Sequence, residues 1–197
     1  SRAMLLPHQV EAALRVLESV NPRFLIADEV GLGKTIEAAL IIKEFILKYN
    51  FERVLICVPS PLLNQWQSEL ANKFNENFTI VTGEMLRTNP KVLLQHNKAL
   101  ISVDLAKDIR YRTYFLQKPY DIIVFDEAHR LRRDLKKVTK AYSFAEAVAR
   151  NTKVLLLLSA TPFRGKLEEI YYLVQLLDPD ILGPLQSFLT EFSGEKT

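Results

Sequence analysis

This chain of 197 residues has little cysteine, little net charge and no long apolar run. Its single cysteine, Cys57, excludes an internal disulfide and a cysteine-based zinc site within the chain. A net charge of +3 is too small to indicate a polyanionic partner, so any nucleic-acid surface must be local. No apolar run approaches the roughly 18 residues that span a bilayer, and no charged-then-apolar leader opens the chain. We therefore expect an intracellular protein without a membrane partner.

What the chain does contain is a series of short apolar runs rich in branched side chains. We predict strands at residues 24–27, 54–58, 78–81, 100–103, 122–125 and 154–158. Segments with helical spacing lie between most of them, at residues 35–49, 62–74, 105–116 and 138–149. Such alternation predicts an α/β fold with a mostly parallel sheet covered by helices on both faces. We place one domain at residues 1–192, followed by a tail at 193–197.

The segment from Asp28 to Thr35 follows a predicted strand and opens a predicted helix. A turn of this kind directs backbone N–H groups and the positive end of a helix dipole at one point, where a phosphate binds. Gly31 and Gly33 allow the backbone to approach that phosphate closely. Lys34 then reaches the outer phosphates, and the Thr35 hydroxyl is placed to hold Mg²⁺. Because Asp28 stands where the common phosphate-loop pattern has glycine, a glycine-rich turn with a surface lysine remains the alternative.

Two adjacent carboxylates, Asp126 and Glu127, end the predicted strand at 122–125. The carboxyl ends of parallel strands are where open α/β sheets bind ligands. Asp126 would orient Mg²⁺ beside Thr35, and Glu127 would polarise the water that attacks the γ-phosphate. Alone, the pair would be a helix cap with a surface acid. Together with Lys34, about 90 residues earlier, it predicts a catalytic site for Mg-nucleotide formed by Lys34, Asp126 and Glu127.

A third strand end carries small residues, Ser159, Ala160 and Thr161, followed by a proline. Their hydroxyl groups can hydrogen-bond His129, which follows the acidic pair. Such a contact would report the state of the nucleotide to whatever binds alongside, so we predict a coupling role for these four residues. A tight proline turn is the alternative.

These motifs, in this order, resemble those of superfamily-two helicases over most of the chain. Gln9 and residues 28–35, 126–129 and 159–161 are similar to the Q motif and motifs I, II and III of that superfamily. The segment 27–38 resembles the Swi/Snf group, in which Asp28 is expected, and Val30 resembles the RapA-like branch, as do residues 6–9. The resemblance implies a RecA-like P-loop fold and the first, ATP-binding lobe of such a motor.

The same resemblance implies ATP and Mg²⁺ as cofactors, with Mg²⁺ held by Thr35 and Asp126. It implies that Gln9 reads the adenine edge, where the alternative is a solvated residue at a helix start. The ATP-binding residues would be Gln9, Asp28, Glu29, Gly31, Leu32, Gly33, Lys34 and Thr35.

A nucleic-acid strand would, by the same resemblance, contact the segment after Val58 and the region near Ser102. Backbone N–H groups at helix starts and small hydroxyls hold phosphates without reading bases, so the candidates are Pro59, Ser60 and Ser102. Ser60 is also predicted to cap a helix, a role that can coexist with phosphate contact, and Ser102 can be a strand-end hydroxyl alone.

Basic residues are crowded just after the acidic motif. They form either a solvated, charge-rich face or a surface that neutralises nucleic-acid phosphates or meets a second lobe. They are Arg130, Arg132, Arg133, Lys136, Lys137 and Lys140.

Members of the family couple two RecA-like lobes, with ATP between them and arginine fingers on the second lobe. The resemblance therefore implies an ATPase that moves along double-stranded DNA, with a second lobe in cis. This lobe alone would be monomeric and weakly active. Two alternatives stay open: a strand-separating helicase or restriction-type motor, and a nucleotide-gated binding module without turnover. The motor would be cytoplasmic and nucleoid-associated in a prokaryote, or nuclear in a eukaryote.

Overall fold

The computed structural model describes residues 15, 18–27, 33–160 and 166–192. Within these residues, six strands form one sheet in the order β1-β6-β5-β2-β4-β3, and every pairing is parallel. The strands are β1 (Arg23–Ala27), β2 (Val54–Val58), β3 (Thr79–Ile80), β4 (Lys98–Ser102), β5 (Ile122–Phe125) and β6 (Val154–Ser159). The predicted α/β fold with a parallel sheet is confirmed, with each predicted strand found at or within two residues of its expected start.

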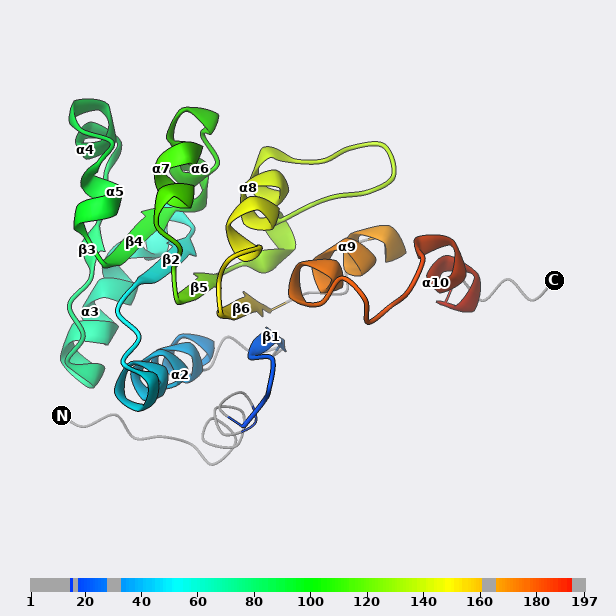
Figure 1. The fold of residues 1–197 in the computed structure, drawn as a ribbon, viewed down its shortest axis with the longest axis horizontal. Helices are drawn as coiled ribbons and strands as arrows, with labels where there is room; N and C mark the ends of the chain where they lie inside the picture. Colours follow the sequence, from blue (N-terminus) through cyan, green and yellow to red (C-terminus); the bar gives the residue numbers. More distant parts are fainter. Residues whose placement is uncertain (1–14, 16–17, 28–32, 161–165, 193–197) are drawn as a thin grey trace.

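Helices cover both faces of this sheet (Figure 1). One face carries α2 (Lys34–Tyr49) and α3 (Leu63–Phe74). The other carries α4 (Gly83–Thr88), α5 (Val92–Gln95), α6 (Val103–Ala106), α7 (Arg112–Gln117), α8 (Lys140–Ala149) and α9 (Leu167–Leu177), and α10 (Leu185–Phe192) packs on α9. Because successive side chains of a strand point to opposite faces, Leu55 and Cys57 of β2 join the second core while Ile56 and Val58 join the first. A strand buried on both faces is therefore apolar throughout.

Two local predictions about helices are wrong, and side-chain hydrogen bonds explain one of them. The helix expected at 105–116 is divided into α6, a 3₁₀ turn η2 (Ile109–Tyr111) and α7. The Ser102 hydroxyl accepts the N–H of Leu105 and so starts α6 early, and the Asp108 carboxylate accepts the N–H of Arg110 and starts a new turn. Ser60 does not cap a helix: it lies inside the 3₁₀ turn η1 (Ser60–Leu62), after Pro59.

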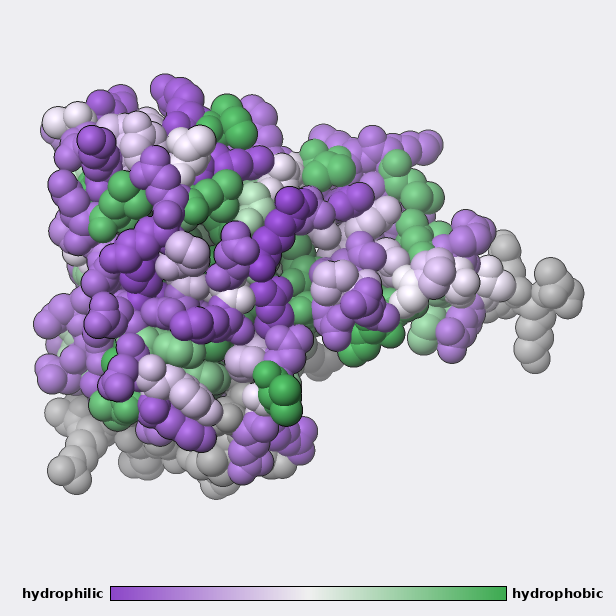
Figure 2. Space-filling view, in the orientation of Figure 1, coloured by the Kyte–Doolittle hydropathy of each residue, from purple (hydrophilic) through white to green (hydrophobic). Residues whose placement is uncertain are grey.

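The surface agrees with a globular protein. The face shown in Figure 2 is mostly hydrophilic, with apolar side chains in small separate groups. Among the described helices, none combines the length and the apolar character needed to cross a bilayer.

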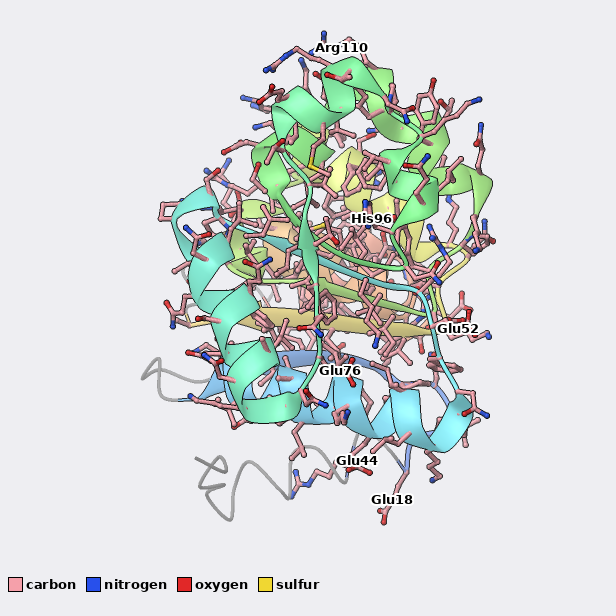
Figure 3. The ribbon with its side chains drawn as sticks, turned by 90° about the vertical axis from the view of Figure 1, so that its left-hand side faces the viewer. Glu18, Glu44, Glu52, Glu76, His96 and Arg110 are labelled. Atoms are coloured by element: carbon pink, nitrogen blue, oxygen red, sulfur yellow. The ribbon has the colours of Figure 1, made fainter. Side chains whose placement is uncertain are left out.

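A buried ion-pair cluster ties the first helical layer to the edge of the sheet. Glu76, just after α3, is only 5% exposed. Its carboxylate pairs with Lys43 of α2 at 2.6 Å and with Lys98 at the start of β4 (Figure 3). Burial alone would raise the pKa of Glu76, but the two ammonium groups outweigh it and hold the pKa below its ordinary value.

We expect Glu76→Gln to lower the free energy of unfolding near neutral pH by about 1 to 3 kcal/mol, because both lysines lose the opposite charge and one of them also loses its acceptor oxygen. Since the folded pKa lies below the unfolded value of about 4.3, the carboxylate stabilises the fold above that value. This stabilisation disappears as the pH falls through the folded pKa, so variant and parent should converge in acid. Urea unfolding at several pH values measures the difference. Glu44→Gln, on the side of α2 away from Glu76, is the control (Figure 3). A pH-independent difference would contradict the prediction.

Candidate active site

The structure describes part of the predicted site. Gly33, Lys34 and Thr35 lie within the described residues, as do all the candidates from Pro59 to Ala160. The remaining candidates lie outside them: Gln9, Asp28, Glu29, Gly31, Leu32 and Thr161.

The order of the strands brings the three predicted motifs to one edge. Strand β6 lies between β1 and β5, with Ala27 level with Ser159 and Phe125 level with Leu157. Because all three strands run in the same direction, their carboxyl ends lie side by side. The phosphate-loop strand, the acidic motif and the Ser159 motif are therefore neighbours, although about 30 to 130 residues separate them in sequence.

Helix α2 begins at Lys34, directly after Gly33. Gly33 has φ 103°, a left-handed conformation that glycine adopts without steric cost. Its carbonyl accepts the N–H of Glu37 at 2.8 Å and so starts the helix. Lys34 is 8% exposed, which does not agree with the alternative of a surface lysine on an ordinary turn. Because α2 follows β1, whose carboxyl end lies beside that of β6, we expect the positive end of its dipole to face the edge of the sheet that carries the acidic motif.

Three hydrogen bonds hold Asp126. Its N–H donates to the carbonyl of Cys57 at the end of β2 (2.9 Å). Its Oδ1 accepts the N–H of Glu127 (2.8 Å), and its Oδ2 accepts the indole N–H of Trp66 (3.0 Å). Neither acidic residue caps a helix through its side chain, since η3 (Ala128–Arg130) has no such cap. The alternative of an ordinary helix cap is therefore not what the structure shows.

Glu127 has a left-handed backbone with φ 53° and ψ 45°. This conformation costs a residue with a side chain about 1 to 2 kcal/mol, and such strain is concentrated at functional sites. It turns the chain sharply after β5 and leaves Glu127 Oε2 3.3 Å from His129 Nε2. The two side chains are each about one-third exposed, so the carboxylate remains accessible to water.

His129 joins Glu127 to the third motif. Its Nδ1 lies 3.2 Å from the Oγ of Ser159, which is 1% exposed. A neutral imidazole that donates its Nε2–H to Glu127 can accept the Ser159 hydroxyl at Nδ1. The predicted hydrogen bond between this strand end and His129 is present, and Ala160 follows directly after it. A coupling role for these residues stays a prediction.

The predicted metal ligands suit Mg²⁺. The Thr35 hydroxyl and the Asp126 carboxylate are oxygen donors, and each Asp126 oxygen keeps a lone pair beyond the hydrogen bond that it accepts. Within the described ranges, no group of three or more His, Cys, Asp or Glu side chains could hold a metal ion. Mg²⁺ bound together with a nucleotide needs only one or two protein ligands, so the donor set fits this ion.

The nucleic-acid candidates also meet at one place. Val58 and Ser102 are level with each other on the paired strands β2 and β4, so the segment after β2 lies beside the end of β4. Pro59 is buried and Ser60 is exposed, so a direct contact falls to Ser60. The Ser102 hydroxyl is 8% exposed and accepts a backbone N–H, which agrees with its alternative role at the strand end.

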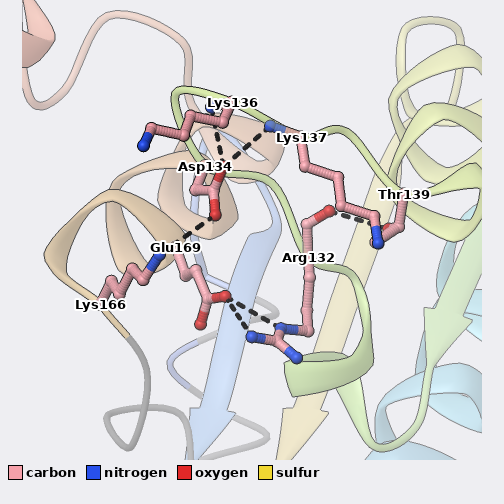
Figure 4. Close-up of polar contacts among 7 residues, drawn as sticks. All are labelled: Arg132, Asp134, Lys136, Lys137, Thr139, Lys166 and Glu169. Carbon is pink, nitrogen blue, oxygen red and sulfur yellow. Dashed lines mark hydrogen bonds and ion pairs between the residues drawn. The ribbon is translucent and has the colours of Figure 1, made fainter.

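The basic segment after the acidic motif forms a hairpin, residues 131–139, held against α8 and α9 (Figure 4). Arg132 pairs with Glu169 of α9 through two contacts of 2.9 and 2.7 Å, and Arg133 pairs with Glu146 of α8. Asp134 accepts the N–H groups of Lys136 and Lys137 and pairs with Lys166. Two of the six basic residues therefore stabilise the lobe itself, while Lys136 and Lys137 are exposed.

Trp66 is the site residue that sequence reasoning missed. Its position predicted a helix packed on the sheet, and the side chain is indeed 1% exposed. Its indole N–H nevertheless reaches Asp126, which is 60 positions away in sequence. The only local signal is a polar N–H on an apolar helix face, which must find an acceptor when buried.

Comparisons with known proteins agree with this geometry. The model of the SNF2-related domain matches residues 8–197. An uncharacterized ATP-dependent helicase, YqhH, of Bacillus subtilis is 41% identical over 98% of this chain and 32% of its own length. The RNA polymerase-associated protein RapA of Vibrio atlanticus is 39% identical over 96% of this chain and 20% of its own length. The chain thus spans a third or less of these relatives.

Solved structures share the fold. The Sulfolobus solfataricus SWI2/SNF2 ATPase core in complex with dsDNA superposes with a TM-score of 0.79 and 21% identity, covering 98% of this chain and 39% of that one. The Pyrococcus furiosus Hef helicase domain gives a TM-score of 0.67 and 24% identity over 86% of this chain and 35% of that one. These similarities confirm the RecA-like architecture.

Proposed function

The chain belongs to the SNF2-related domain family, as the first RecA-like lobe of a Snf2-type ATPase, and from this we propose that it binds Mg-ATP for a motor that moves along double-stranded DNA. One observation carries the proposal. The sheet order β1-β6-β5 places the carboxyl ends of β1, which precedes Lys34, and of β5, which precedes Asp126, on either side of the end of β6, which carries Ser159. A lobe spanning residues 1–192 fits this assignment.

The residues at this edge have different roles in phosphoryl transfer. Lys34 and the N-terminus of α2 bind the outer phosphates, and Thr35 and Asp126 hold the metal ion. Bound Mg²⁺ would neutralise the charge that develops on the phosphates. Glu127 orients the attacking water and accepts its proton, and His129 keeps the Glu127 carboxylate in place through the 3.3 Å contact.

Coupling to nucleic acid would use the neighbouring strand ends. Ser60 and Ser102 lie at the ends of β2 and β4, and β2 is hydrogen-bonded to β5, which carries the acidic motif. A strand held by these residues would contact the protein through phosphates, without base readout. On the other side of β5, Ser159 and His129 connect the acidic motif to β6.

The decisive experiment uses the protein that contains this lobe at its natural length. We expect duplex DNA to stimulate its ATPase activity more than single-stranded DNA or RNA does, at one stated salt concentration. We also expect it to displace the third strand of a DNA triplex without separating a forked duplex. Lys34→Ala is the matched control and should abolish both activities. Separation of the fork would favour the strand-separating alternative, and nucleotide binding without turnover would favour a nucleotide-gated module.

A further inference from the structure

Trp66 is the single tryptophan of the chain and lies near the start of α3. Its side chain is 1% exposed and belongs to the core between α2, α3 and the sheet. Phe74, on the same helix, fills the same core without a polar group. A phenylalanine at position 66 would also place an aromatic ring in this core, but it would carry no donor, so the indole N–H is the feature that needs an explanation.

That N–H donates to Asp126 Oδ2 at 3.0 Å. Among the described residues, it is the only side-chain group that donates a hydrogen bond to this carboxylate. The other oxygen accepts the N–H of Glu127, and the backbone of Asp126 is tied to Cys57. The carboxylate is thus held at both oxygens and has one defined orientation.

An indole is a donor only, so at Oδ2 it occupies one lone pair and leaves the remaining lone pairs of the carboxylate for a cation. Partners of this kind orient metal-binding carboxylates, and their loss usually weakens metal binding by 10- to 100-fold.

We propose that Trp66 is a positioning residue that presents Asp126 to the Mg²⁺ of the bound nucleotide. The inference rests on the proposed function. It also gives α3 a role beyond packing, because Trp66 of this helix contacts the proposed metal ligand Asp126. The same helix follows the turn that contains Ser60, the exposed nucleic-acid candidate after β2. The segment from Cys57 to Trp66 therefore contacts Asp126 at both its ends, through the Cys57 carbonyl and the Trp66 indole.

The first test separates positioning from packing. Binding of a fluorescent ADP analogue to this chain is titrated with Mg²⁺, with Trp66→Phe and Phe74→Leu compared as matched core variants. We expect Trp66→Phe to need about 10- to 100-fold more Mg²⁺ for half-maximal binding. Phe74→Leu should keep the Mg²⁺ requirement of the parent, even if urea unfolding shows the same loss of stability. An unchanged Mg²⁺ requirement in Trp66→Phe, or an equal rise in both variants, overturns the inference.

The second test uses the unmodified chain, so it does not depend on a variant that folds. Because the chain has one tryptophan, its tryptophan emission, excited at the long-wavelength edge where its tyrosines do not absorb, comes from Trp66 alone. We expect Mg-ADP to change this emission and ADP with a chelator to change it much less. Asp126→Asn should remove the difference between the two. Equal responses with and without Mg²⁺ in the parent contradict the inference.

The two ideas fail in different ways. If the parent chain binds no Mg-nucleotide, the proposed function fails and the role of Trp66 fails with it. If the parent binds Mg-nucleotide and Trp66→Phe binds it with the same dependence on Mg²⁺, only the role of Trp66 is contradicted.

Discussion

ATP hydrolysis by the 197-residue chain alone is expected to be about 10³- to 10⁵-fold slower than by the same lobe joined to a second RecA-like lobe. The physical reason is that an arginine finger stabilises the charge of the transition state and contributes a factor of this size. The family resemblance places such fingers on the second lobe. The chain spans only 32% and 20% of two relatives, which leaves ample length in those proteins for that lobe.

Steady-state phosphate release with saturating duplex DNA measures this difference. Binding of a fluorescent ADP analogue is the control, because Lys34 and Thr35 belong to this chain and should retain weak affinity for Mg-nucleotide. Lys34→Ala in the longer protein should reduce turnover to the level of the isolated lobe or below it. Rapid DNA-stimulated turnover by the isolated chain would show that it needs no second lobe.

Glu127→Gln in the longer protein is expected to lower the rate of ATP turnover by about 10²- to 10⁴-fold, the usual contribution of a general base. Glutamine keeps the size of the side chain but cannot accept the proton of the attacking water. Nucleotide affinity should change little, because Lys34 and Asp126 remain in place. Single-turnover hydrolysis, together with a binding titration of the same variant, separates the two effects.

Glu146→Gln is the matched control for this substitution. Glu146 is also an acid paired with a nearby cation, Arg133, but it lies on α8 and away from the strand ends. We expect its variant to turn over ATP at the parental rate. Unimpaired turnover by Glu127→Gln would mean that Glu127 is not the general base. It would also contradict the proposal that these residues form the hydrolytic site of a motor.

Much of the fold could be predicted from the sequence because strands buried on both faces are apolar throughout. Strands β2 and β6 show this, with every residue buried. Prediction failed where the chain forms short turns in place of one regular helix. The Asp108 side chain accepts a backbone N–H and so begins a new turn, whereas Ser60 lies in a 3₁₀ turn after Pro59 without a side-chain cap. At Asp108 the competition between side chain and backbone is local but depends on which hydrogen bond is available.

The candidate site was predictable to the same extent. Lys34, Thr35, Asp126 and Glu127 could be proposed as candidates because of their residue types and their positions after an apolar run. Trp66 could not, because its partner lies 60 residues away and its surroundings are those of an ordinary core residue. The left-handed backbone of Glu127 was equally hidden, since nothing in its residue type favours that conformation.

The sequence by itself determined the class of fold, the family and the groups available for phosphate and metal chemistry, because these follow from local pattern and residue type. Only the tertiary structure decided that β6 lies between β1 and β5, and that Trp66, Asp126, His129 and Ser159 meet at one edge. The physical reason is that strand order and side-chain hydrogen bonds join residues distant in sequence. Their partners are selected by packing of the whole core, which no local pattern records.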